Sequence, residues 1–133
     1  MAQTTVISTK ELKRQAALAF EGRTLKVMLC ELTGEFFTAE SLVSEWQTVE
    51  KSGNGYVRFS EVLGTGSYST TLGAYTIPTI VAEFTATAPY TYNTVVLYFN
   101  GETYVHSIVT ENPNITLSTD QTQSYVININ QDD

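Results

Sequence analysis

The chain has 133 residues, enough for one ordinary domain that buries roughly two-thirds of its unfolded surface. A hydrophobic fraction of 42% argues against intrinsic disorder, and one cysteine with one histidine provides neither a disulfide framework nor a His-rich metal site. The net charge of −7 comes entirely from residues 59–133, which carry acidic residues but no Lys or Arg, so we expect neither a nucleic acid nor an anionic membrane as partner.

The N-terminus predicts an extended arm followed by a helix. The first seven residues end in Thr4-Thr5-Val6-Ile7 and suggest an extended arm. Residues 1–10 are polar and Thr-rich, and they lack the basic start and apolar core of a signal peptide. Ser8 and Glu11 have the spacing of a capping box, and apolar residues then recur at helical period. We therefore expect a helix over residues 9–20, ending before Gly22.

A strand and a second helix follow. Residues 25–32 form a short apolar run of strand length. Thr38 can cap a helix over residues 39–49, in which one face is apolar and consists of Leu42, Val43, Trp46 and Val49.

From residue 51 onward the pattern is that of β structure. Gly53-Asn54-Gly55 predicts a turn before a strand over residues 56–63, and residues 64–73 are interpreted as a plain Gly/Ser/Thr loop. Pro78 restricts any strand containing it to an edge or a strand start. Residues 80–86 then alternate strictly, and we expect the side chains of Ile80, Ala82, Phe84 and Ala86 to point inward.

The clearest local signal is a hairpin around Asn100-Gly101. This dipeptide favours a type I′ turn, which would pair Phe99 with Glu102 and Leu97 with Tyr104. A second turn is expected at residues 112–114, and a last strand alternates through Tyr125, Ile127 and Ile129.

These elements predict a mainly β protein with seven or eight short strands, a β-sandwich or jelly-roll-like body. One or two short helices would precede this body, with an extended N-terminal arm before them. In domain terms, we expect an arm over residues 1–8 and one β-rich domain over residues 9–133, with helices near 9–20 and 39–49.

No motif in the sequence supports catalysis, and we expect a protein that is not an enzyme and uses no metal or cofactor. His106 is interpreted as a rim or cross-strand residue, because no Gly-x-Ser-x-Gly elbow accompanies it. Cys30 lies in an apolar run and is expected to act as a small buried hydrophobe. The glycines of residues 64–73 lack the lysine and the helix of a phosphate-binding loop.

Tyrosines around the predicted hairpin are the candidate interface residues. Tyrosine suits interfaces because it combines apolar area with a polar tip, although half-buried strand positions are the alternative. The extended arm is the second candidate. The full set of candidate interface residues is Thr4, Thr5, Val6, Ile7, Tyr90, Tyr92, Tyr98 and Tyr104.

The order of segments resembles a group of small structural proteins of tailed bacteriophages, including phages of cyanobacteria. The similarity runs from about Leu12 to the end of the chain and rests on structural motifs. These motifs are Ala17-Leu18-Ala19-Phe20-Glu21-Gly22, Lys26-Val27-Met28-Leu29, an acidic helix, Ser52-Gly53-Asn54-Gly55-Tyr56-Val57-Arg58, Ile77-Pro78-Thr79 leading to Phe84-Thr85-Ala86, and Tyr92-Asn93-Thr94-Val95-Val96-Leu97-Tyr98.

The resemblance implies a non-enzymatic component of the virion, assembled in the host cytoplasm. We expect a capsid cement (decoration) protein that stabilises the shell, with the alternative of a tail or baseplate accessory that acts as a fibre adaptor. Its partners would be phage capsid or tail proteins and copies of itself, a trimer being favoured. The arm would then thread across neighbouring subunits or capsid proteins, as ordering segments do when they bind.

Overall fold

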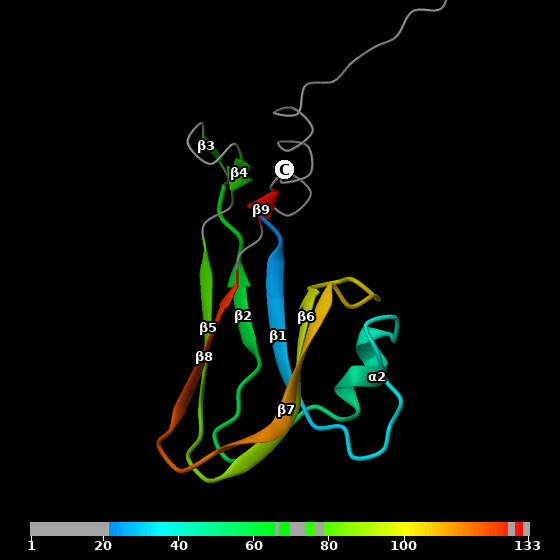
Figure 1. Cartoon of the computed structure of the whole chain (residues 1–133). Coiled ribbons are helices and arrows are strands. Elements are labelled where there is room, and N and C mark those ends of the chain that lie inside the picture. Colours follow the sequence, from blue (N-terminus) through cyan, green and yellow to red (C-terminus); the bar gives the residue numbers. More distant parts are fainter. Residues whose placement is uncertain (1–21, 66, 70–73, 77–78, 128–129, 132–133) are drawn as a thin grey trace, which may run out of the picture.

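The computed structural model describes residues 22–65, 67–69, 74–76, 79–127 and 130–131. The predicted arm, the predicted helix over residues 9–20, Pro78 and Ile129 lie outside these residues. Figure 1 shows a body built mainly from antiparallel strands, with one short helix beside it. The predicted mainly β fold is therefore confirmed.

The described residues form nine strands and one helix. In chain order these are β1 (Thr24–Cys30), α2 (Val43–Gln47), β2 (Phe59–Val62), β3 (Ser67–Ser69), β4 (Ala74–Thr76), β5 (Ile80–Thr85), β6 (Tyr90–Phe99), β7 (Ser107–Leu117), β8 (Thr122–Ile127) and β9 (Asn130–Gln131). They pair in three sheets: β2-β1-β6-β7, β5-β8 and β3-β4-β9.

The four-stranded sheet is covered on one face by the β5-β8 pair. Leu25 and Val27 of β1 and Val95 of β6 pack there against the inward side chains of β5. The predicted alternation of β5 is confirmed, since Ile80, Ala82, Phe84 and Ala86 are all buried. This first core accounts for most of the buried apolar side chains.

The opposite face of the same sheet is covered by residues 31–51, which include α2 and which we call the α2 layer (Figure 1). Trp46 is fully buried there against Met28, Val96 and Tyr98, and its indole nitrogen donates to the Thr38 carbonyl at 2.9 Å. Both faces of β6 are therefore covered, which explains why its side chains are buried almost without alternation.

The second helix is shorter than predicted. Thr38 starts a turn rather than the helix, because the Ser41 amide donates to its carbonyl at 3.0 Å. The helix begins only after Leu42, whose backbone is extended and whose amide donates to the Glu45 carboxylate. Tertiary contacts thus limit α2 to residues 43–47.

The predicted hairpin register is wrong by three residues. Leu97 pairs with Ser107 rather than Tyr104, and Val95 pairs with Val109. Asn100 does not have the positive φ that a type I′ turn requires, and its amide donates to Thr24 on β1. Tyr104 forms a bridge to Leu42 instead, so residues 100–106 form a longer connection that reaches the α2 layer.

The predicted turn at residues 112–114 is also wrong. These residues lie inside β7, and the β6–β7 pairing shifts register there, between the Tyr92–Ile115 and Thr94–Thr110 pairs. Several β7 residues thus face Asn93 alone, which makes this a bulge in a continuous strand. Pro113 is tolerated because bulged positions need not donate a ladder hydrogen bond.

Of two smaller predictions, one is confirmed and the other is wrong. The turn at residues 53–55 is confirmed by the hydrogen bond from the Tyr56 amide to the Gly53 carbonyl, and a Cβ on Gly55 would lie 2.8 Å from Thr87. The interpretation of residues 64–73 as a plain loop is wrong for β3, which pairs with β4.

Candidate functional site

Three of the four candidate interface tyrosines lie in the interior. Tyr90, Tyr92 and Tyr98 are buried within the chain, whereas Tyr104 is 70% exposed. The fold therefore assigns the first three to the core and leaves only Tyr104 on the surface. The arm candidates Thr4, Thr5, Val6 and Ile7 lie outside the described residues.

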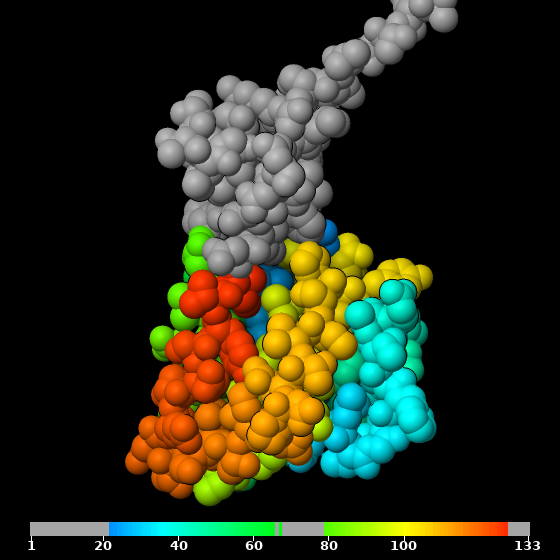
Figure 2. All heavy atoms as spheres, in the orientation of Figure 1, coloured from blue at the N-terminus to red at the C-terminus, as the bar shows by residue number. Residues whose placement is uncertain are grey.

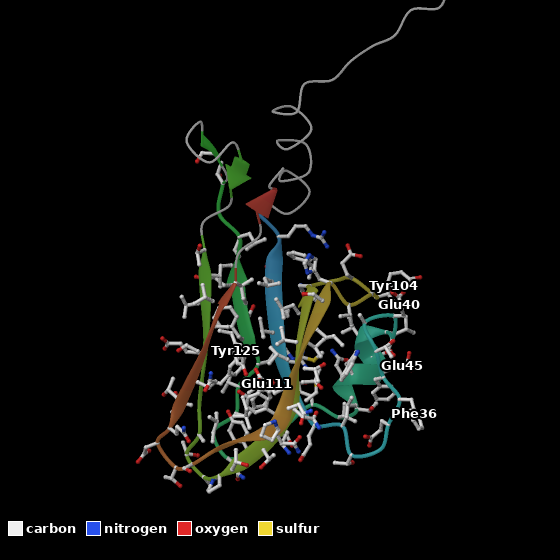
Figure 3. The ribbon with its side chains drawn as sticks, viewed as in Figure 1. Phe36, Glu40, Glu45, Tyr104, Glu111 and Tyr125 are labelled. Atoms are coloured by element: carbon white, nitrogen blue, oxygen red, sulfur yellow. The ribbon has the colours of Figure 1, made fainter. Side chains whose placement is uncertain are left out.

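A hydrogen-bonded chain of side chains connects three strands. The hydroxyls of Tyr92 on β6 and Tyr125 on β8 are 2.6 Å apart, and Tyr125 donates to Glu111 on β7 at 3.2 Å. Burial and these two neighbours raise the pKa of Tyr125. The chain thus bridges β7 and β8, as the positions of Tyr125 and Glu111 in Figure 3 illustrate.

A second polar network ties the α2 layer to the sheet. Arg58 donates to both carboxylate oxygens of Glu50 and, at 2.9 Å, to the Tyr98 hydroxyl. Tyr56 donates to Glu50 at 2.5 Å and accepts from the Leu29 amide at 3.1 Å. Sequence reasoning missed this network, because no spacing rule brings these positions together. Its polar groups bind one another, so it serves the fold.

Neither His106 nor Cys30 lies in a catalytic arrangement. The His106 ring packs edge-on against Phe99, and partial desolvation together with the Arg23 charge lowers its pKa. Cys30 is fully buried, as predicted, and burial raises the pKa of its thiol to about 12. A thiol in that state is neutral and unreactive at physiological pH.

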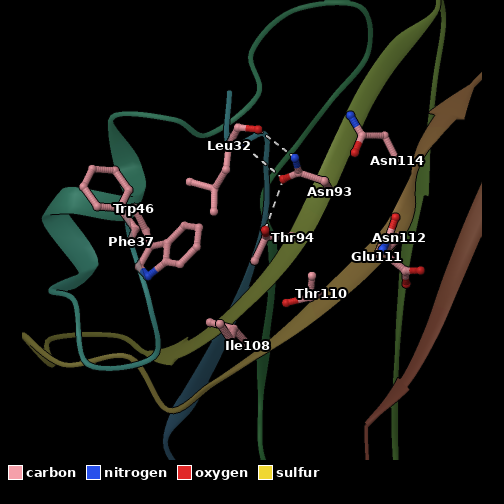
Figure 4. Close-up of a pocket in the computed structure, with 10 residues that line it drawn as sticks. All are labelled: Leu32, Phe37, Trp46, Asn93, Thr94, Ile108, Thr110, Glu111, Asn112 and Asn114. Carbon is pink, nitrogen blue, oxygen red and sulfur yellow. Dashed lines mark hydrogen bonds between the residues drawn. The ribbon is translucent and has the colours of Figure 1, made fainter. Parts of the chain in front are cut away.

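A hollow of about 250 Å³ with both polar and apolar lining residues lies beside Trp46 (Figure 4). Asn93 exchanges two hydrogen bonds of 2.8 Å with the backbone of Leu32 and accepts a third from Thr94. Its amide therefore anchors the start of the α2 layer to β6. The bulge residues Asn112 and Asn114 form the outer rim of this hollow.

An opening into the first core lies between β7 and β8, and we call it the open seam. It is a mainly apolar hollow of about 200 Å³ whose lining includes Val95, Leu97, Val109, Tyr125, Val126 and Ile127. Val109 faces the same side of the sheet as Val95, its pairing partner, yet it is 45% exposed. The core is thus incompletely covered on this side.

Both strands that border the open seam have an unpaired edge. Among the described residues, β7 pairs only with β6 and β8 only with β5. Figure 2 shows the surfaces of β7 and β8 next to each other on the viewed face. Unpaired edges with apolar side chains between them are the usual template for adding another strand.

Exposed side chains gather beside α2 as well. Figure 3 shows Phe36, Glu40, Glu45 and Tyr104 on this outer surface. Phe36 is 96% exposed and Tyr104 70%. We call this set the acidic-aromatic surface, because it places the two carboxylates of Glu40 and Glu45 beside two exposed aromatic rings.

No group of three or more His, Cys, Asp or Glu that could hold a metal ion occurs among the described residues. The part of the chain that the structure describes also holds no helix long and apolar enough to cross a membrane. Comparison with known protein families, curated proteins and solved structures finds no match for this chain.

Proposed function

We propose that this chain is a non-enzymatic structural protein of a tailed-bacteriophage virion, acting as a capsid cement protein. The observation that carries the proposal is the open seam, an apolar hollow between two strand edges that have no partner in the part of the chain that the structure describes. An isolated domain gains nothing from such an opening, whereas an assembly protein uses it to bind a neighbour.

The titratable groups support a role without catalysis. Glu50, Arg58 and Tyr56 bind one another, and Tyr125 with Glu111 bridges two strands. Both sets are hydrogen-bonded within the fold. Each holds two layers or strands in place, which is what a protein under mechanical load requires.

The acidic-aromatic surface supports contact with the shell. Tyr104 and Phe36 offer exposed aromatic area, and Glu40 and Glu45 supply negative charge next to it. Aromatic side chains contribute strongly to binding when a partner buries them. In this proposal a basic groove of the capsid protein covers this surface, while the open seam joins copies of the chain, favoured as a trimer.

The resemblance to phage structural proteins supports the placement on a virion. The packing of β5-β8 across one core from the four-stranded sheet supports a sandwich-like body of the kind expected there. Such a body is rigid enough to sit on a shell while other segments make contacts.

Electron cryomicroscopy of the particle containing this chain tests the proposal. We expect many copies spread over the icosahedral shell, each with the acidic-aromatic surface toward the capsid protein. Density confined to the tail would overturn the cement role in favour of a fibre adaptor. Absence from the particle would overturn both placements.

A further inference from the structure

We propose that the open seam binds the segment Thr4–Ile7 of a second copy as an added β-strand. This inference rests on the proposed assembly function and names the contact that joins one copy to the next. The occupant is thus a segment of this same chain, and the site is the gap between β7 and β8.

The open seam provides both things that an added strand needs. The edges of β7 and β8 that have no partner strand among the described residues offer backbone amides and carbonyls, which give affinity without regard to sequence. Between them the floor is apolar, formed by Leu97 and Val95, with Ile127 half-buried at the side. An incoming strand would therefore pair its backbone and bury alternate side chains.

The length of the opening matches a short segment. The hydrogen bond from Tyr125 to Glu111 closes the gap between β7 and β8 at the level of Glu111. The β7 edge that remains beside the hollow is Ser107–Thr110, which spans about 13 Å at the usual rise of a strand. Thr4–Ile7 has the same number of residues.

The side chains of the arm fit an apolar site between strands. Met1–Ile7 contains no Asp, Glu, Lys or Arg, so it brings no side-chain charge into an apolar site. Thr4, Thr5, Val6 and Ile7 are all β-branched residues, which favour strands. In an added strand one of the two apolar side chains faces the floor, while the other lies against the outer lip at Val126.

The intervening chain is long enough to reach a neighbour. Residues 8–21 connect the segment to β1 and span on the order of 45 Å when extended. Within one copy, β6 and β7 lie between β1 and the open seam in the order of the sheet. A linker of this length lets Thr4–Ile7 reach the open seam of a neighbouring copy, where it would pair with a strand edge that has no partner among the described residues.

Disulfide trapping between single variants of the full chain tests this assignment. Val6→Cys and Val109→Cys are placed in two chains that carry different tags and are expressed together, then oxidised with diamide. We expect a covalent dimer that contains both tags and disappears on reduction. Cys30 does not compete, because it is fully buried.

Val57→Cys is the matched control for Val109→Cys. Val57 is also a valine and is 75% exposed, but it does not line the open seam. We expect its mixture with Val6→Cys to give less than one-tenth of the mixed dimer. Equal yields in the two mixtures would overturn the proposal. Circular dichroism of each variant shows whether its fold is kept.

Two further measurements separate this inference from the proposed function. In one chain, the double variant Val6→Cys/Val109→Cys must form dimers or larger species; a monomer closed by its own disulfide would overturn the exchange between copies. Sedimentation velocity of the unmodified chain reports self-association. Association without trapping overturns the arm contact and leaves the assembly function standing, whereas a monomer at all concentrations overturns self-assembly as well.

Discussion

The two faces of β6 show two ways to finish a β body. On one face Val96 and Tyr98 are covered by the α2 layer and are fully enclosed. On the other face Val95 and Leu97 are buried, but beside them Val109 is 45% exposed at the open seam. The same strand thus supports a closed flank and an open flank.

The comparison shows which contacts are needed to cover a face of the four-stranded sheet. The α2 layer contains little regular structure, and it is held by one large side chain, Trp46, and by the Glu50–Arg58 network. The open flank is covered by the regular strands β5 and β8, but no described element covers the β7 edge near Val109. Irregular segments can therefore seal a sheet when specific bonds anchor them, whereas regular edges remain open until another strand arrives.

Removing Trp46 should break the closed flank and gives the largest expected effect. Trp46→Ala deletes a fully buried indole that packs against Met28, Val96 and Tyr98. We expect the free energy of unfolding to fall by about 4 kcal/mol. Urea denaturation followed by circular dichroism measures it, since the substitution removes the only tryptophan.

Phe36→Ala is the control for this prediction. Phe36 is a large aromatic residue of the same layer but is 96% exposed, so its loss should change stability by less than about 0.5 kcal/mol. Comparable losses in the two variants would show that the layer is not anchored by Trp46.

Breaking the Glu50 network should weaken the closed flank by a smaller amount. Glu50→Gln removes the charge that faces Arg58 and an acceptor of the Tyr56 hydroxyl, and we expect a loss of about 2 kcal/mol in urea denaturation. Glu102→Gln removes a carboxylate from the more exposed pair with Arg23, and the expected loss is below about 1 kcal/mol. Reversal of this order would contradict an anchoring role for Glu50.

The sequence predicts elements whose signal is periodic. The alternation of residues 80–86 reports one buried and one exposed face, and the structure confirms it residue by residue. The apolar run around Cys30 likewise predicts the central strand β1, because a strand covered on both faces is mostly apolar, with only Thr24 and Lys26 as polar residues here.

Predictions that depended on local turn signals failed where tertiary contacts prevailed. Asn100-Gly101 favours a two-residue turn, but the Asn100 amide donates to the Thr24 carbonyl, and Tyr104 forms a β-bridge with Leu42. Pro113 signals a turn, yet it is accommodated by a bulge opposite Asn93. No local pattern reports these long-range partners.

The open seam was equally beyond prediction from sequence. Val109 reads as an ordinary strand residue, and only the absence of a described strand beyond β7 exposes it. Three of the four candidate interface tyrosines are buried for a related reason. Tyr92 binds Tyr125 and Tyr98 binds Arg58 inside the fold, and hydroxyl partners of this kind are invisible in composition.

Tyr125→Phe tests how much the Tyr125 hydroxyl stabilises the open flank. The substitution removes the hydroxyl that bonds to Tyr92 and Glu111, and we expect a loss of about 1 kcal/mol. Hydrogen exchange should show faster exchange in β8 than in the unmodified chain. Tyr104→Phe is the control, since that hydroxyl is on an exposed side chain and its removal should leave stability unchanged.

The smallest expected effect is a pH dependence at the rim of the open flank. His106 is the sole histidine. Its pKa is lowered from 6.5, mainly by desolvation and to a smaller extent by the charge of Arg23, which forms an ion pair with Glu102. Because the unfolded chain then binds the proton more readily, this contribution is complete above about pH 6.5 and is lost as pH falls through the lowered pKa. Urea midpoints between pH 8 and pH 5 should therefore fall slightly in the unmodified chain.

His106→Gln should flatten this part of the profile while it keeps a polar side chain beside Phe99 and Ser107. An unchanged slope in the variant would assign the pH dependence to carboxylates instead. A flattened slope would show that protonation of His106 weakens the flank whose core is only partly covered. In that case the two flanks differ in their response to acid as well as in their packing, because the closed flank has no histidine to titrate in this range.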